Sequence, residues 1–257
     1  MRIGAHLRQD DDPLATAADL GIDVFQMFVT DPQKFHKPVP NPRAQEFRDS
    51  PIDVVVHSSY RINVASRNNR IRMPSRKAVA EQATAAADLG AIGLVVHGGY
   101  LGADEDAAEG FLNWHKLFDR QAGNGGFGLP ILIENTAGGG DRAMARTLEA
   151  IDRLWDAVGE FDEAGFCLDT CHAWAGGEDL VGLVDRVRAI TGRIDLVHLN
   201  NSRDEFDSGR DRHANLESGQ IDADVLVAVA RAADAPIILE TPADGVQADL
   251  AYLRAAR

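Results

Sequence analysis

Short apolar runs rich in β-branched residues recur along the whole chain. Eight of them begin 22 to 41 residues apart, at 2–7, 24–29, 53–58, 93–98, 130–135, 166–171, 195–200 and 236–241. Each run has the length of one strand, and most are apolar at consecutive positions, which is typical of strands buried on both faces. The pattern therefore predicts eight buried strands.

The segments between these runs are rich in alanine and have helical periodicity, most clearly at 75–89, 141–157 and 179–190. Gly21 and Gly90 stand where two helices would end, and Pro74 precedes a helix that Ser75 could cap. Alternation of strand and helix indicates a parallel sheet, and eight repeats are the number that closes a (β/α)8 TIM barrel. The main competing fold is an open doubly wound sheet.

Length and composition fit one domain over residues 1–257, because 257 residues, 45% of them hydrophobic, are typical of a single barrel. No run of about 18 apolar residues is present, and the first residues lack the apolar stretch of a secretory signal. We therefore expect a monomeric, cytoplasmic protein with no membrane contact. Cys167 and Cys171 are interpreted as reduced packing residues.

The formal net charge of −14 argues at first against a nucleic-acid partner, because phosphate binding depends on Lys and Arg. The segment 61–77 differs from the rest of the chain, since it has no acidic residue. Its cations are Arg61, Arg67, Arg70, Arg72, Arg76 and Lys77. Taken alone, the segment is a solvated helix approach; a phosphate-binding surface is the alternative.

Histidines and carboxylates end six consecutive apolar runs. Because the active sites of barrel enzymes form at the carboxyl ends of the strands, we expect these side chains to share one rim. The long segment 201–220 adds two more. The full set is His57, His97, Glu134, Asp169, His172, His198, Asp211, His213 and Glu240.

Nine such groups at one rim predict bound cations. Without them, burial of the unpaired carboxylates would cost on the order of several kcal/mol each. Imidazole and carboxylate ligands suit Zn²⁺ or Mn²⁺, and nine ligands exceed what one or two ions need, so we predict two or three ions. Glu134, midway in the strand order, is the best candidate for a bridging carboxylate. Three divalent ions would outweigh four carboxylates and attract a phosphodiester.

These residues lie in strings that closely resemble the endonuclease IV family of abasic-site endonucleases, among the xylose isomerase-like TIM barrels. The resemblance covers nearly the whole chain and is most specific at HSSYRIN (57–63), ENTAG (134–138), CLDTCHAWAGG (167–177), HLNNSRDE (198–205) and DRHANL (211–216). It implies a barrel with three zinc ions. By this likeness His57, His97 and Glu134 hold the first ion, Glu134, Asp169, His198 and Glu240 the second, and His172, Asp211 and His213 the third.

The resemblance also implies an activity, namely hydrolysis of the phosphodiester 5′ to an abasic site in double-stranded DNA. The products would be a 3′ hydroxyl and a 5′ deoxyribose phosphate, with a metal-bound hydroxide as nucleophile and Glu134 as the catalytic residue that orients it. Trimming of blocked 3′ ends would use the same site.

Candidate DNA contacts follow from the same resemblance. Tyr60 matches an inserting tyrosine of the family, although an exposed tyrosine at this place is otherwise ordinary loop packing. The candidate phosphate contacts are Arg61, Arg67, Arg70, Lys34 and Arg212, with Lys37 and Arg210 as further cations.

Three positions depart from the family pattern, and none is a predicted ligand. His97-Gly98-Gly99 stands where many members have His-Pro-Gly, Pro32-Gln33-Lys34 stands in the loop of an inserting arginine, and Glu217 replaces an expected glycine. They bear on the DNA contacts rather than on the metals.

The main alternative function is a metal-dependent sugar isomerase or epimerase of the xylose isomerase type. Such a site uses one or two ions and needs fewer ligands. The additional residues His172, Asp211 and His213 and the Arg-rich segment favour the nuclease.

Overall fold

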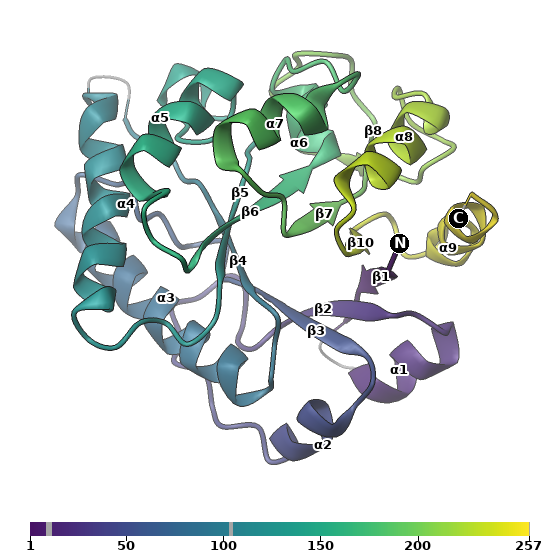
Figure 1. The fold of residues 1–257 in the computed structure, drawn as a ribbon, viewed down its shortest axis with the longest axis horizontal. Coiled ribbons are helices and arrows are strands. Elements are labelled where there is room, and N and C mark those ends of the chain that lie inside the picture. Colours follow the sequence, from purple (N-terminus) through teal and green to yellow (C-terminus); the bar gives the residue numbers. More distant parts are fainter. Residues whose placement is uncertain (9–11, 103–104, 257) are drawn as a thin grey trace.

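Eight parallel strands close into a barrel in the computed structural model, which describes residues 1–8, 12–102 and 105–256 (Figure 1). The order around the barrel is β1-β10-β7-β6-β5-β4-β3-β2. The strands are β1 (Ile3–His6), β2 (Val24–Phe28), β3 (Asp53–His57), β4 (Leu94–His97), β5 (Ile131–Glu134), β6 (Ala164–Asp169), β7 (Leu196–His198) and β10 (Ile237–Leu239). Each overlaps one of the eight predicted runs, and the predicted (β/α)8 TIM barrel is confirmed.

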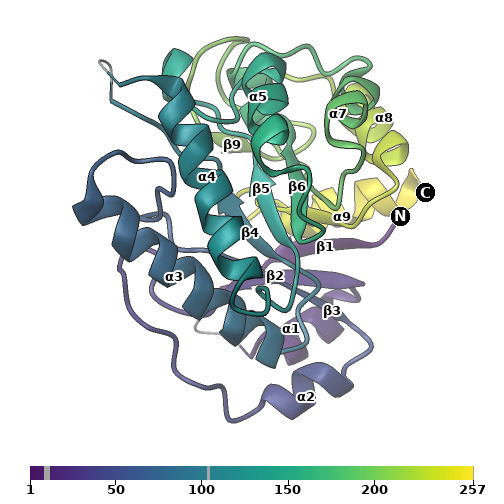
Figure 2. The same ribbon diagram turned by 60° about the vertical axis from the view of Figure 1, so that its left-hand side comes forward.

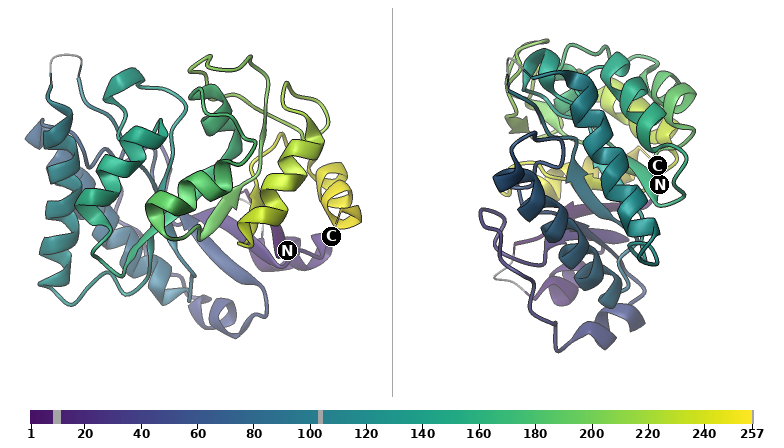
Figure 3. Two further views of the ribbon diagram at one scale, coloured as in Figure 1. Left: turned by 45° about the horizontal axis from the view of Figure 1, so that its top comes forward. Right: turned by 90° about the vertical axis from the view of Figure 1, so that its left-hand side faces the viewer.

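Helices cover the outside of the barrel (Figure 2). They are α1 (Pro13–Leu20), α2 (Ala44–Asp49), α3 (Asn69–Asp88), α4 (Ala107–Ala122), α5 (Leu148–Val158), α6 (Thr170–Ala175), α7 (Leu183–Thr191), α8 (Ala223–Ala233) and α9 (Val246–Ala255), with a 3-10 turn at Gly140–Arg142. The last helix returns to the first strand, so both ends of the chain lie close together (Figure 3). No helix among the described residues is both long and apolar enough to cross a membrane.

All three predicted helix starts differ from those observed; the helix expected over 179–190 begins at Leu183, and the other two differ by more. The helix expected from Ser75 begins six residues earlier, because Asn68 caps it by accepting from Arg70 N–H, and Pro74 lies inside it. Ser75 is buried in the helix, where its hydroxyl donates to Ile71 O. The helix expected over 141–157 begins only at Leu148, where the Thr147 hydroxyl caps it. Side-chain caps decided both starts over the apolar periodicity.

Strand alternation divides the apolar core into two layers. The larger layer packs between the outer faces of the strands and the helices. The smaller one fills the barrel interior with one residue from each of seven strands: Val24, Val55, Val95, Leu132, Cys167, Leu196 and Ile238. On the eighth strand the equivalent position is Gly4, where a Cβ would lie 1.5 Å from Val24 O. Cys167 and Cys171 are buried and free, as predicted.

The long segment after β7 contains a small antiparallel hairpin, β8 (Asn201–Ser202) with β9 (His213–Ala214). Asn201 fastens its base, because the side-chain amide donates to Leu216 O at 2.7 Å and to Ile221 O at 2.8 Å. The hairpin folds back toward α6, which it contacts. It therefore brings the segment around Asp211 to the rim at which β6 ends.

Candidate metal centre

A ring of polar side chains stands directly above the interior apolar layer. Side chains two residues apart point to the same face of a strand, so each residue of the layer is followed by a second inward position. Those positions hold His6, Gln26, His57, His97, Glu134, Asp169, His198 and Glu240. Each strand of the barrel thus contributes one apolar residue or glycine, and the polar residue two positions later lies in the same strand or, for Glu240, directly after β10.

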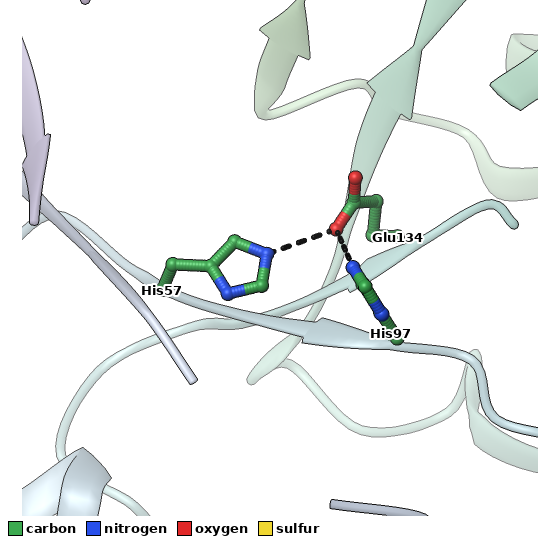
Figure 4. A group of neighbouring side chains, drawn as sticks. All are labelled: His57, His97 and Glu134. Carbon is green, nitrogen blue, oxygen red and sulfur yellow. Dashed lines mark hydrogen bonds and ion pairs between the residues drawn. The ribbon is translucent and has the colours of Figure 1, made fainter. Parts of the chain in front are cut away.

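Glu134 lies at the centre of this ring and is fully buried. Its Oε2 lies 3.2 Å from His57 Nε2 and 3.1 Å from His97 Nε2 (Figure 4). Its Oε1 lies 3.0 Å from His198 Nδ1 and 3.3 Å from His172 Nδ1. One carboxylate therefore faces four imidazoles, two with each oxygen.

The structure brings all nine predicted ligands together in three groups, in each of which the ligand atoms lie within 4.8 Å of one another. The groups are His57, His97 and Glu134; Glu134, Asp169, His198 and Glu240; and His172, Asp211 and His213. Within the third group, Asp211 Oδ1 lies 3.1 Å from Nε2 of both histidines.

A fourth group was not predicted and consists of Asp169, Cys171 and His213. Burial, together with the nearby Asp169, raises the pKa of the Cys171 thiol to about 12. The thiol is therefore protonated at neutral pH, and the third group, which has only nitrogen and oxygen ligands, is the better site for a cation.

Unsatisfied imidazole nitrogens show that this site fits divalent ions. His172 Nε2 and His213 Nε2 are buried without a hydrogen-bond partner among the described residues. Their Nδ1 atoms donate to backbone carbonyls, His172 to Asn135 O at 2.9 Å and His213 to Glu240 O at 3.2 Å. A ring fixed through one nitrogen, with the other left free toward a carboxylate, is the arrangement of a metal-ligating histidine.

His198 is oriented differently, by the side chain of Gln26. Gln26 is fully buried on β2, and its Oε1 lies 2.9 Å from His198 Nε2. Its Nε2 donates to Glu240 Oε1 at 2.6 Å and lies 2.9 Å from His6 Nδ1. Gln26 therefore leaves His198 Nδ1 facing Glu134 and also holds Glu240.

Sequence reasoning missed Gln26, and it missed two asparagines of similar function. Asn200 Nδ2 donates to Asp169 Oδ2 at 2.7 Å, and its Oδ1 accepts from Glu240 N. The Asn135 amide exchanges two hydrogen bonds with the Asp169 backbone. The sequence did contain a signal for such residues, namely a polar residue inside an apolar run. Gln26, for example, stands two positions after Val24, which faces the barrel interior.

In the absence of a cation, charge coupling lowers the pKa of Glu134 and raises the pKa of His172, His198 and His213, whereas burial lowers the pKa of His57. Burial alone would raise the pKa of Glu134, but His97, His198 and His172 lower it well below its usual range. Burial would lower the pKa of His213, but Asp169 and Asp211 raise it to about 9. Binding of divalent ions would therefore displace protons from these imidazoles.

Tyr60 forms one wall of the hollow above this centre. Its ring centroid lies 5.4 Å from that of His57 and 5.8 Å from that of His97, and 48% of the residue is exposed. The loop after β2 is fastened to it, because Tyr60 N donates to Pro32 O at 2.9 Å. Gln33 and Tyr60 thus border a hollow of about 370 Å³ that is lined by residues of all three groups.

Several cations predicted to contact DNA already have partners inside the protein. Arg72 Nη1 donates to Ser66 O at 2.9 Å, and Arg76 Nη2 donates to Asn113 O at 2.9 Å, so these two support the loop before α3 and its packing on α4. Ion pairs join Arg67 to Glu109, Arg212 and Arg210 to Asp204, and Lys34 to Asp31.

Arg61, Arg70 and Lys37 differ from these cations. All three are exposed, and among the described residues their charged groups have no ion-pair partner. Arg61 lies next to Tyr60 and lines a hollow with it. The structure therefore leaves these three groups free for an anionic partner.

Comparison with known proteins agrees with this architecture. The family of xylose isomerase-like TIM barrels matches residues 14–256. The chain is 52% identical over 254 residues to the probable endonuclease 4 of Mycobacterium leprae, covering 99% of this chain and 98% of the relative. The crystal structure of endonuclease IV from Thermus thermophilus superposes with a TM-score of 0.84 at 28% identity, covering 100% and 98%. A D-tagatose 3-epimerase-like protein shares the fold, with a TM-score of 0.80 at 17% identity over 100% and 97%.

Proposed function

The chain belongs to the endonuclease IV family of the xylose isomerase-like TIM barrels, and on this basis we propose that it is a metal-dependent DNA repair endonuclease. Its substrate is double-stranded DNA that contains an abasic site or a blocked 3′ end. It hydrolyses the phosphodiester 5′ to the lesion and leaves a 3′ hydroxyl and a 5′ deoxyribose phosphate. We propose further that it acts as a monomer in the cytoplasm.

The observation that carries this proposal is the set of three ligand groups, two of which share Glu134 while His172 of the third lies beside it. Three zinc ions would occupy the groups His57, His97 and Glu134; Glu134, Asp169, His198 and Glu240; and His172, Asp211 and His213, with Mn²⁺ as an alternative at one or more of them. When bound, such ions lower the pKa of an attacking water and stabilise charge on the phosphate and on the departing oxygen.

The protein's own groups fix where that chemistry takes place. Glu134 belongs to two of the three groups, and its pKa well below the usual range keeps it ionised at every pH at which the protein would work. An ionised carboxylate at this place can accept a hydrogen bond from the attacking water and orient it. Gln26 and the backbone carbonyls hold the imidazole rings, so the ligand nitrogens are positioned before any ion arrives.

DNA binding at this rim requires a positive local electrostatic potential, although the net charge of the chain is −14. Asp211 and Tyr60 are exposed at the mouth of the hollow, and Arg61 lines the adjoining hollow. Arg61 and Arg70 are exposed and have no ion-pair partner in the described part of the chain. We assign phosphate contacts to Arg61, Arg70 and Lys37, and contact with the lesion to Tyr60. Arg67, Arg212 and Lys34 would have to exchange an ion pair for a phosphate.

The third ligand group distinguishes this function from that of a sugar isomerase on the same barrel. An isomerase site of one or two ions would use the first two groups, and His172, Asp211 and His213 would then have no task. A hairpin built to hold Asp211 and His213 beside His172 instead supports a larger ion cluster and a phosphodiester substrate.

The deciding experiment is cleavage of a duplex that carries one tetrahydrofuran abasic analogue. The purified protein should cut this duplex on the 5′ side of the lesion and leave the undamaged duplex intact. Chelator treatment should abolish cleavage, and added Zn²⁺ or Mn²⁺ should restore it. A fully metal-loaded protein that fails to cut the lesion duplex would show the proposed function to be wrong.

A further inference from the structure

A second hollow lies beside the metal centre and has an unusual lining. Its volume is about 510 Å³, within the range of ligand pockets in general. Four of the nine exposed large hydrophobic residues in the described part of the chain border it: Phe35, Tyr60, Ile71 and Tyr100. We call this hollow the aromatic trough. Arg61, whose guanidinium has no ion-pair partner among the described residues, also lines it.

Tyr100 combines a fixed backbone with a free side chain. The Asn63 side chain holds it on both sides, because Nδ2 donates to Tyr100 O at 2.8 Å and Oδ1 accepts from Tyr100 N at 3.3 Å. An antiparallel bridge to Ala143 fixes the same residue from the other side. Nevertheless, Tyr100 is 61% exposed, the largest exposed fraction of any aromatic residue in the described part of the chain.

The glycine before Tyr100 makes this arrangement possible. Gly99 has a φ of 77°, and a Cβ there would lie 2.6 Å from Asn63 Oδ1. Any other residue would therefore be strained and would push away the side chain that holds Tyr100. The His97-Gly98-Gly99 string thus serves to fix Tyr100 next to a candidate ligand.

The trough is continuous with the metal centre. A smaller hollow of about 330 Å³ is lined by Tyr60 and Tyr100 on one side and by His97, His172 and Asp211 on the other. Tyr100 and Tyr60 therefore line both hollows. If a phosphate of a DNA strand lies at the candidate ligands, the nucleotide on its 5′ or its 3′ side would pass the two tyrosines and reach the trough.

We propose that the aromatic trough receives the nucleobase next to the scissile phosphate on the cut strand, with that base stacked on Tyr100. This inference rests on the proposed function. A base matches this lining because its faces are apolar and its edges are polar: aromatic and apolar side chains lie beside Asn63, Ser66, Asn68 and Glu105. Stacking tolerates any base because each has a π face. The free guanidinium of Arg61 matches the phosphate on the same nucleotide. The trough therefore selects lesions whose neighbouring base can leave the helical stack.

The test is a double-mutant cycle in which a protein side chain and a DNA base are removed separately and together, and the binding affinity is measured each time. The ligand is a tetrahydrofuran duplex in which a methylene group replaces the bridging oxygen that is cut, so that binding is measured without cleavage. Two further duplexes lack the base on the 5′ or on the 3′ side of the lesion. Tyr100→Ala should weaken binding to the first duplex about 5- to 100-fold. On the duplex that lacks the stacked base, the same variant should bind as tightly as the wild type.

Three controls separate stacking from other effects. Tyr100→Phe keeps the ring and should bind like the wild type. Leu112→Ala removes an exposed apolar side chain on α4, away from the trough, and should change nothing. Metal content and melting temperature should be equal in all variants. The inference is overturned if Tyr100→Ala binds all three duplexes like the wild type, or if its loss is the same on all three.

The cleavable duplex distinguishes this inference from the proposed function. If the wild type cuts it but the cycle shows no coupling, the trough is assigned wrongly and the endonuclease assignment stands. If the wild type does not cut it, the endonuclease assignment fails first, and the inference fails with it.

Discussion

The polar ring inside the barrel and the Arg-rich segment 61–77 are neighbours, since the segment begins four residues after the ring residue His57. Their side chains are nevertheless held in place in different ways. The ring side chains come from the strands or the residue directly after one and are mostly buried, with a second hydrogen bond to hold them, as for His198 and Asp169. The cations of the segment are long, and they differ in pairing: Arg67 forms an ion pair with Glu109, whereas Arg61 has no ion-pair partner among the described residues. The strand backbone therefore fixes the positions of the ring side chains, whereas the positive charge that the Arg-rich segment presents depends on which of its cations are paired.

The largest expected effect concerns the centre of the ring. Glu134→Gln removes the charge shared by two ligand groups but keeps size and hydrogen bonding. Cleavage of the tetrahydrofuran duplex should fall at least about a thousandfold, because the metal-assisted step loses its central carboxylate. Circular dichroism should show an intact fold. Glu149→Gln, on the surface helix α5, is the matched control and should cleave normally; full activity of Glu134→Gln would refute the bridging position.

The second effect compares the titration of His213, in the third ligand group, with metal binding. In the metal-free protein the pKa of His213 is about 9, above the ordinary value near 6.5 of the unfolded chain. Its stabilisation is complete below about pH 6.5 and is lost as the pH rises through 9, a fall of roughly 3 kcal/mol. Chemical denaturation from pH 6 to 9.5 measures it.

The zinc-loaded protein is the comparison for that titration. Bound ions require neutral imidazoles, so the loss of stability between pH 6.5 and 9 should be absent. Parallel pH curves for the metal-free and zinc-loaded forms would contradict the assignment of His213 as a ligand.

The difference between the polar ring and the Arg-rich segment also explains how much of each could be predicted from the sequence. The eight runs and the residues at their ends were predictable, because a strand fixes its side chains with a period of two and barrel sites form at the carboxyl ends. The pattern could have placed Gln26 inside the barrel, but not its contact with His198, since only the closed barrel brings these two side chains together. The start of α3 depended on the Asn68 cap, and the pairing of Arg67 with Glu109 joins residues distant in sequence.

A third prediction tests the hidden member of the ring. Gln26→Leu keeps approximate size but loses the hydrogen bonds to His198 and Glu240. Zinc affinity, measured by competition with a chromogenic chelator, should weaken about 10- to 100-fold. The surface variant Gln247→Leu is the control and should bind zinc like the wild type. Unchanged affinity in Gln26→Leu would mean that the strands alone position these ligands.

The smallest expected effect separates free cations from paired ones. Arg61→Ala should weaken binding of the lesion duplex several-fold and reduce the slope of log affinity against log salt by about one. Arg67→Ala, whose ion pair with Glu109 competes with phosphate, should change the slope less. Fluorescence anisotropy over a salt series measures both; equal slopes for the two variants would show that internal pairing does not decide which cations bind DNA.

Each strand places a residue of the interior floor, apolar or glycine, two positions before a polar residue of the ring. This spacing determines which kinds of mutation the barrel tolerates. A substitution at a ring position alters the chemistry and leaves the hydrophobic floor beneath it untouched. A single residue inserted before Ile133 in β5 would instead shift the register of that strand, turning Glu134 toward the helices and Ile133 into the ion site. New activities on this scaffold are therefore reached by point substitutions, while changes in strand length are closed to it.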